Sequence, residues 1–160
     1  MESGKTRTRG VSGAYALGVQ GASGRVLVVD DDEVIRQLIR VNLELEGFEV
    51  VTADDGADCL EVVHGVRPDV ITLDVVMPRL DGLRAAECLR ADPRTREIPL
   101  ALVSACGAGG LGDREAARVD AVLAKPFEPS ALVGMVRRLA RQARSARGRG
   151  GKGAPSVPHG

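Results

Sequence analysis

Short apolar runs of the sequence are each followed by a side chain that can take part in phosphoryl chemistry. These side chains are Asp30, Asp31, Asp32, Asp74, Ser104 and Lys125. Crowded carboxylates repel one another, and a hard cation with oxygen ligands relieves that repulsion. Mg²⁺ suits such a set because it keeps several waters and binds through one or two carboxylates plus a phosphoryl oxygen. A lysine and a hydroxyl opposite the metal would hold the remaining phosphoryl oxygens.

The apolar runs that precede these side chains predict the strands of a parallel sheet. The predicted strands are 26–29, 48–52, 70–73, 98–103 and 121–124. Strands that are apolar throughout and alternate with helical patterns indicate a sheet covered on both faces. In such sheets ligands bind outside the carboxyl ends of the strands, where the polar side chains stand. The predicted fold class is therefore α/β, a five-stranded doubly wound parallel sheet.

Helical patterns lie between the predicted strands. An apolar stripe of Val34, Leu38, Val41 and Leu45 predicts a helix that ends at Gly47. A second helix is expected over 57–64, with Gly65 as its C-terminal stop. Asp81 is a plausible N-cap for a helix over 82–91, and the last helix opens at Pro129. Four glycines within 107–112 predict that the fourth helix is short or mobile.

Composition and charge bound the kind of protein. The 160 residues contain no apolar run near the ~18–20 residues of a membrane span, and the three cysteines form no CxxC pair. These features predict a soluble cytoplasmic protein with reduced thiols. An acidic body over 25–141 lies between basic, glycine-rich ends at 1–24 and 142–160, which we expect to be disordered. We expect no folded DNA-binding domain after residue 141, although the basic tail could contact acidic surfaces nonspecifically.

Four motifs carry a family resemblance: VLVVDDD, LDVVMPRLDG, ALVSA and LAKPF, in this order and spacing. Together they resemble the receiver domain of bacterial two-component response regulators, over roughly residues 25–141. The resemblance implies a flavodoxin-like receiver fold with strand order 2-1-3-4-5. It also implies a stand-alone, chemotaxis-regulator-like signalling protein rather than an enzyme, which takes a phosphoryl group from a histidine kinase and contacts a downstream effector.

The resemblance also assigns roles to individual residues. It implies Asp74 as the phospho-acceptor and Asp31 as a direct ligand of Mg²⁺. Asp30 would act mainly through metal-bound water, and the backbone carbonyl of Val76 would complete the metal site. Asp74 would itself contribute to that site.

Further positions bear on the switch that follows phosphorylation. Lys125 would pair with the phosphoryl group, and Ser104 would bond to it. Pro126 matches a family position whose preceding peptide bond is often cis, which an X-Pro bond permits. Many receivers carry Tyr or Phe three residues before the lysine, whereas this chain has Val122. The usual aromatic readout is therefore in doubt.

Other readings compete with these assignments. Asp32 could serve as an N-cap for the helix that starts at Glu33. The segment VLVVDDDEV also fits a haloacid-dehalogenase-type phosphatase with Asp30 as nucleophile, although the acidic pair which that family needs after its lysine is missing. A third reading is a receiver-like module that binds partners without phosphorylation, and Val122 is its main support.

Two positions concern the lifetime of a phosphorylated state. In receivers, the residues two beyond the acceptor and two beyond the Ser/Thr flank the path of the hydrolytic water. Here those positions hold Val76 and Cys106, which offer no hydrogen bond or only a weak one. The sequence therefore predicts slow self-dephosphorylation.

Overall fold

A five-stranded parallel sheet forms the centre of the protein. The computed structural model describes residues 23–75, 80–105 and 111–156. The strands are β2 (Arg25–Val29), β3 (Glu49–Ala53), β4 (Val70–Asp74), β5 (Leu100–Ser104) and β6 (Ala121–Ala124). They lie in the order β3-β2-β4-β5-β6, and every neighbouring pair is parallel. Counted along the chain this is the order 2-1-3-4-5, so the predicted fold class is confirmed.

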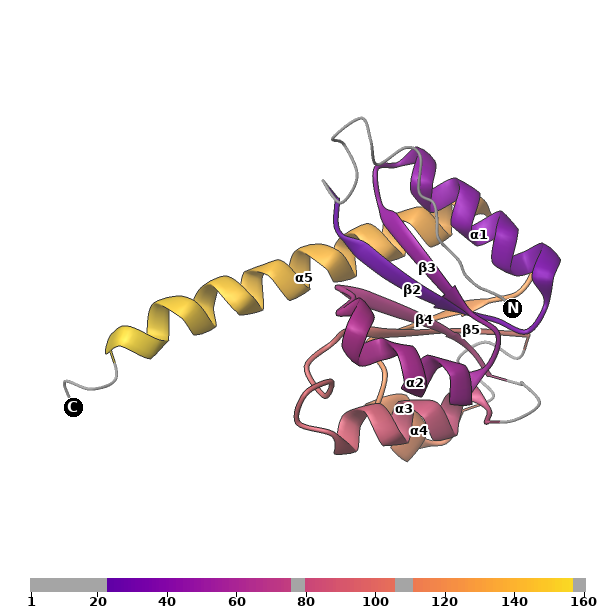
Figure 1. The fold of residues 1–160 in the computed structure, drawn as a ribbon. Helices are drawn as coiled ribbons and strands as arrows, with labels where there is room; N and C mark the ends of the chain where they lie inside the picture. The colour runs from indigo at the N-terminus through magenta and orange to yellow at the C-terminus, as the bar shows by residue number, and fades with distance from the viewer. Residues whose placement is uncertain (1–22, 76–79, 106–110, 157–160) are drawn as a thin grey trace.

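Helices cover both faces of the sheet. They are α1 (Glu33–Leu45), α2 (Gly56–Val66), α3 (Gly82–Ala91), α4 (Asp113–Ala117) and α5 (Pro129–Ser156). Figure 1 shows α1 and α5 on one side of the sheet and α2 and α3 on the other. Along β2, Val26 and Val28 belong to the core under α1 and α5, whereas Leu27 and Val29 belong to the second core. Successive strand side chains point to opposite faces, so a sheet buried on both faces needs apolar residues throughout.

The first helix forms as predicted, but its predicted apolar stripe does not face the core. Ile39 and Leu43 are the buried residues of α1, and Ile35 packs partly against the same core. The residues of the predicted stripe are exposed instead: Val34, Leu38, Val41 and Leu45. Two apolar stripes at helical spacing share this helix. Periodicity alone cannot decide which stripe meets the sheet, because both satisfy the 3.6-residue repeat.

The ends of two further helices test the predicted signals. Asp81 is the N-cap of α3, and its carboxylate accepts a hydrogen bond from the Arg84 amide, as predicted. The prediction that Gly65 ends α2 is wrong. The helix continues to Val66, and its C-cap is Arg67 in the left-handed conformation. Val63 C=O accepts from the Arg67 amide, so the left-handed cap is made without a glycine.

The fourth helix is a single short segment, as the glycine-rich sequence before it predicts, with five residues in α4. The last helix is much longer than predicted. Residues 142–156 were expected to be disordered, yet α5 continues to Ser156 and extends past the edge of the sheet in Figure 1. Ala143 is buried, and Arg144 donates from Nη1 to the Ser23 carbonyl at 2.9 Å. These tertiary contacts hold the first turn beyond residue 141, and lengthening an existing helix costs less than starting one.

Within the described residues, no helix combines the length and the apolar character needed to span a bilayer.

Candidate functional site

The carboxyl edge of the sheet gathers the polar side chains that the sequence singled out. Asp30 directly follows β2, and Asp74 is the last residue of β4. Together with Asp31 they offer carboxylate oxygens that all lie within 4.8 Å of one another. Asp30 is buried, with 1% of its surface exposed, and Asp74 retains 9%. Asp31 is exposed to solvent. The cluster therefore has a closed inner side and an open outer side.

Lys125 is the cation that faces this cluster. It follows β6, and its Nζ lies 3.2 Å from Asp30 Oδ2 and 3.4 Å from Asp74 Oδ1. Its backbone amide donates to the Ser104 carbonyl at 2.9 Å, which ties the residue to the end of β5. One ammonium thus serves two of the three carboxylates of the cluster, those of Asp30 and Asp74.

Local hydrogen bonds hold the first loop of the site in place. Asp30 Oδ1 accepts from the Asp32 amide at 2.9 Å. Arg36, one turn into α1, donates from Nη1 to the Asp30 carbonyl at 2.8 Å. Asp32 caps α1 by accepting from the amides of Val34 and Ile35, so the N-cap reading of this residue is confirmed. The Asp32 carboxylate is thereby engaged by the helix, and the cluster consists of Asp30, Asp31 and Asp74.

The surroundings of the cluster disfavour the ionised form of Asp74. Burial raises the pKa of Asp74 above its ordinary value, and the charge of Asp30 raises it further, whereas Lys125 acts in the opposite direction. Burial lowers the pKa of Lys125, but the charges of Asp30 and Asp74 outweigh this effect, so its pKa is raised overall. Lys125 is therefore protonated. Its single positive charge does not neutralise the three carboxylates of the cluster.

Ser104 and Val122 occupy the next two strands. Ser104 ends β5, is buried, and lies opposite Ala124 in the β5–β6 register. Val122 pairs with Leu102 in the same ladder and packs against the second core. Many receivers carry Tyr or Phe at this position, and that ring changes its position when the Ser/Thr moves. Val122 has neither a ring nor a hydroxyl, so it cannot respond to Ser104 in that way. The Lys125–Pro126 peptide bond is cis, as the family resemblance implied.

Two glycines shape the loop beside Asp74, and sequence reasoning missed one of them. A Cβ on Gly82 would stand 2.2 Å from the carbonyl oxygen of Asp74, and a Cβ on Gly56 would stand 2.2 Å from that of Leu80. Gly56 also donates its amide to this Leu80 oxygen at 2.9 Å. A side chain at either position would displace backbone next to the cluster. Gly56 carries no sequence signal, because it is the close approach of a distant loop that demands it.

Several predicted residues lie outside the described part of the chain. They are Val76, whose carbonyl was predicted as a metal ligand, and Cys106, which with Val76 was predicted to flank the path of the hydrolytic water. Their predicted roles stay predictions.

The described carboxylates fit a magnesium ion by their chemistry. Mg²⁺ prefers hard oxygen donors, and Asp30, Asp31 and Asp74 supply three carboxylates within reach of one point. A divalent cation would also supply the positive charge that Lys125 alone does not provide. The open side at Asp31 leaves room for water molecules, which Mg²⁺ tends to keep.

Comparison with known sequences agrees with the geometry. Residues 26–137 match the response regulator receiver domain family. The transcriptional regulator RpaA of Synechocystis is 35% identical over 118 residues, which are 72% of this chain and 48% of that protein. Response regulator PleD of Caulobacter vibrioides is 42% identical over 121 residues, 73% of this chain and 26% of that protein. The chain spans about half the length of RpaA and about a quarter of PleD.

Solved structures give the same family. Chemotaxis response regulator CheY4 of Vibrio cholerae is similar with a TM-score of 0.65 and 31% identity, over 72% of this chain and 97% of that one. The receiver domain of the Francisella response regulator 1452 gives a TM-score of 0.68 and 31% identity, over 74% and 98%. The chain belongs to the response regulator receiver domain family. Members are signalling domains rather than true enzymes: they accept phosphoryl groups, generally bind Mg²⁺ in an acidic pocket, and interact with histidine kinases and effectors.

Proposed function

We propose that this protein accepts a phosphoryl group from a histidine kinase on the carboxylate of Asp74, with Mg²⁺ held by Asp30, Asp31 and Asp74. The observation that supports this most strongly is the shared cation: Lys125 contacts both Asp30 and Asp74 inside one cluster of three carboxylates. Asp74 is the member at the end of the central strand β4. The Asp74 side chain is mostly buried, and a phosphodonor would reach it from the carboxyl edge of the sheet.

The chemistry follows from the charges. An oxygen of Asp74 forms the new P–O bond while the bond from phosphorus to the donor breaks, and the donor keeps that electron pair. Mg²⁺ would neutralise charge on the phosphoryl oxygens. Lys125 would move its ammonium from the two carboxylates to a phosphoryl oxygen, since the arriving group carries more negative charge than the acceptor it modifies. Ser104, at the end of the neighbouring strand β5, would bond to another phosphoryl oxygen.

Acetyl phosphate with Mg²⁺ tests this directly. The parent protein should gain one phosphoryl group, mapped by mass spectrometry to Asp74 after reductive trapping of the acyl phosphate. Asp74→Asn should gain none, because an amide is a poor nucleophile. A phosphoryl group found on Asp30 in the parent would overturn the proposal and favour the phosphatase reading.

Wider parts of the proposal rest on the family. We propose that residues 25–141 act as the receiver unit, in the cytoplasm, with a histidine kinase as donor and an effector protein as the reader of the phosphorylated face. Phosphotransfer profiling against the kinases of the source organism would identify the donor.

One observation favours a second function. Val122 lacks the ring that usually reports on the switch, and it is partly buried against the second core. A module that binds its partner without phosphorylation is the alternative. Partner capture by the Asp74→Asn variant at the level of the phosphorylated parent would favour it.

A further inference from the structure

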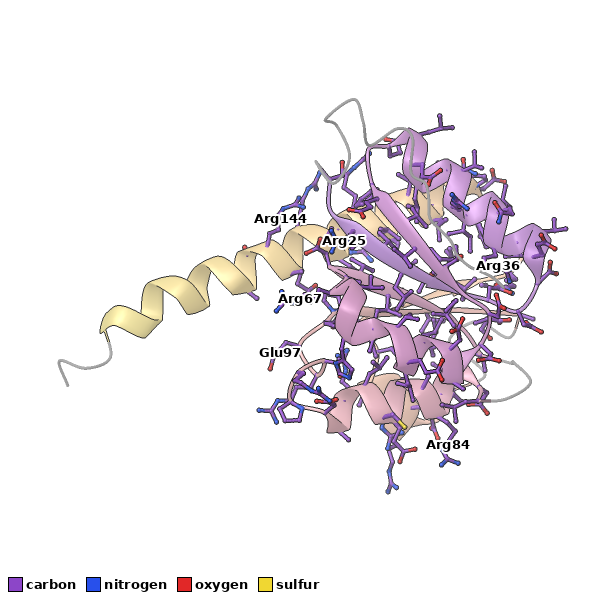
Figure 2. All side chains as sticks on the ribbon, viewed as in Figure 1. Arg25, Arg36, Arg67, Arg84, Glu97 and Arg144 are labelled. Atoms are coloured by element: carbon purple, nitrogen blue, oxygen red, sulfur yellow. The ribbon has the colours of Figure 1, made fainter. Side chains whose placement is uncertain are left out.

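Arg36 lies beside the phosphoryl site, although the sequence analysis assigns it no role there. Its amide donates to the carbonyl of the N-cap Asp32 at 2.9 Å, so Arg36 stands at the end of the first turn of α1. Side chains of a helix point back toward its N-terminus, and a long side chain at this position therefore reaches the loop before the helix. Figure 2 shows Arg36 at the carboxyl edge of the sheet.

This position does not suit a cation by itself. The N-terminus of a helix is the positive end of the helix dipole, which favours acidic side chains in the first turn and disfavours basic ones. The Arg36 side chain is also largely buried, with 14% of its surface exposed. A buried guanidinium is costly unless its donors are used. The contacts of Arg36 have to account for its place in the first turn.

Those contacts lead to the backbone of Asp30. Nη1 of Arg36 donates to the Asp30 carbonyl at 2.8 Å and lies 3.5 Å from Asp54 Oδ1. Asp54 is 74% exposed, so this ion pair contributes little. The Asp30 amide donates to the Ala53 carbonyl at 3.2 Å. Asp30 is thus held through both of its backbone groups, by the end of β3 on one side and by Arg36 on the other.

The loop after β2 needs such a restraint because the carboxylates of the cluster repel one another. Asp74 belongs to β4 and is fixed by the sheet, whereas Asp30 and Asp31 lie beyond the last residue of β2. The Asp30 carbonyl is part of the planar peptide group that joins Asp30 to Asp31. A bond from Arg36 to this carbonyl therefore sets the orientation of that peptide group and the direction in which the chain continues to Asp31.

We propose that Arg36 is a positioning residue for the magnesium site. By holding the peptide group between Asp30 and Asp31, it keeps both carboxylates directed at the point where Mg²⁺ binds. The inference rests on the proposed function, because it takes Asp30, Asp31 and Asp74 as the residues that hold the metal. Arg36 acts through the peptide group and contacts neither the metal nor the phosphoryl group.

The charge of Arg36 and its hydrogen bond have opposite effects on Mg²⁺ affinity. A guanidinium repels a divalent cation, so removal of the charge alone would tighten binding. Removal of the hydrogen bond frees the loop and weakens binding, because groups that orient metal ligands typically contribute about 10–100-fold to metal affinity. The sign of the change in affinity therefore distinguishes a positioning role from the effect of a nearby charge.

Calorimetric titration with Mg²⁺ tests the proposal. Arg36→Met keeps the aliphatic stem and removes the donor, and it should raise the Kd for Mg²⁺ about tenfold. Arg36→Lys restores a donor and should bring the Kd back to within a few-fold of the parent value. Arg40→Met is the matched control, because Arg40 lies one turn further along α1 and pairs with Glu44 at 3.2 Å. This control should leave the Kd at the parent value.

The Mg²⁺ dependence of labelling by acetyl phosphate provides a second readout. Arg36→Met should need about tenfold more Mg²⁺ for half-maximal labelling of Asp74. A loss of folded protein would instead lower the rate at saturating Mg²⁺ without moving this midpoint. Far-ultraviolet circular dichroism checks folding. If Arg36→Met does not fold, Arg36→Gln replaces it, since its shorter side chain does not reach the Asp30 carbonyl, and the same tenfold change is expected.

Asp31→Ala, titrated in parallel, separates failure of this proposal from failure of the proposed function. If Asp31→Ala loses Mg²⁺ binding while Arg36→Met binds as tightly as the parent, or more tightly, the positioning role of Arg36 is wrong and the magnesium site stands. If Asp31→Ala binds Mg²⁺ like the parent, the assigned magnesium site is wrong, and the role of Arg36 is wrong with it.

Discussion

Aspartates stand at both ends of the parallel sheet, and they have different surroundings. At the amino end, Asp69 accepts from the Arg25 amide and Asp120 accepts from the Leu100 amide, each at 2.8 Å. Asp120 also pairs with the Arg90 guanidinium at 2.8 Å. Figure 2 places Arg25, Arg67 and Arg144 toward this end, with Arg36 at the opposite one. At the carboxyl end, Asp30 and Asp74 share Lys125, and Asp31 completes the cluster of three carboxylates.

The difference shows how one residue type serves stability in one place and chemistry in another. At the amino end each carboxylate completes the hydrogen bonding of a strand that has just begun. At the carboxyl end the carboxylates compete for one cation, and the pKa of Asp74 is raised, mainly by burial. Groups held at a cost to folding are typical of functional sites, because ligands supply the missing interactions.

The largest expected effect separates metal binding from the response to phosphorylation. Asp31→Ala should abolish both Mg²⁺ binding and phosphorylation, because it removes the most open carboxylate of the cluster. Lys125→Ala should keep most of the Mg²⁺ affinity, since an ammonium is no metal ligand, but should uncouple phosphorylation from conformational change. Calorimetric Mg²⁺ titrations and circular dichroism with a phosphodonor measure the two effects. Equal loss of Mg²⁺ affinity in both variants would contradict the separate roles.

A matched pair of substitutions compares the two ends for stability. Asp120→Asn should lower the free energy of unfolding by about 1–2 kcal/mol, because it weakens the charge-assisted bonds to Arg90 and to the Leu100 amide. Asp74→Asn should leave that free energy unchanged or raise it, because it removes a buried charge that repels Asp30. Urea unfolding in EDTA provides both values. A larger loss for Asp74→Asn would show that the comparison is wrong.

The dependence of stability on pH sharpens the same contrast. The folded pKa of Asp74 is raised above its ordinary value of 3.8, so the folded protein holds this proton more tightly than the unfolded chain does. The resulting stabilisation is complete below pH 3.8 and is lost as the pH rises through the folded pKa. Without metal, the parent should therefore fall behind Asp74→Asn in stability as the pH rises. Urea unfolding at a series of pH values measures the difference, and a pH-independent difference would contradict the raised pKa.

The smallest expected effect concerns the lifetime of the acyl phosphate. Val76→Asn and Cys106→Glu should each speed its hydrolysis several-fold, because a polar side chain at these sequence positions can orient the attacking water. Decay of the phosphorylated parent and variants, followed by loss of bound phosphate, measures this. If neither variant decays faster than the parent, the prediction of slow self-dephosphorylation should be dropped.

Most of the sheet and of its chemical edge could be read from the sequence. Strands buried on both faces need continuous apolar runs, and a run that stops at Asp30, Asp74 or Lys125 also marks the edge where ligands bind. The parallel order brings these ends together, so residues far apart in the chain could be grouped in advance. Helix N-caps could also be predicted, because the N-cap carboxylate binds backbone amides within the first turn of its own helix. Asp32 and Asp81 are the two examples.

Only the tertiary structure decided the matters that depend on a distant partner. Which apolar stripe of α1 faces the core depends on how the helix sits on the sheet, because both stripes have helical spacing. The continuation of α5 past residue 141 starts with the burial of Ala143 and with the Ser23 carbonyl that Arg144 binds, across 121 positions of the sequence. The need for glycine at 56 comes from the Leu80 carbonyl of another loop. Periodicity and capping are properties of neighbouring residues, whereas these outcomes depend on contacts that exist only after the chain has folded.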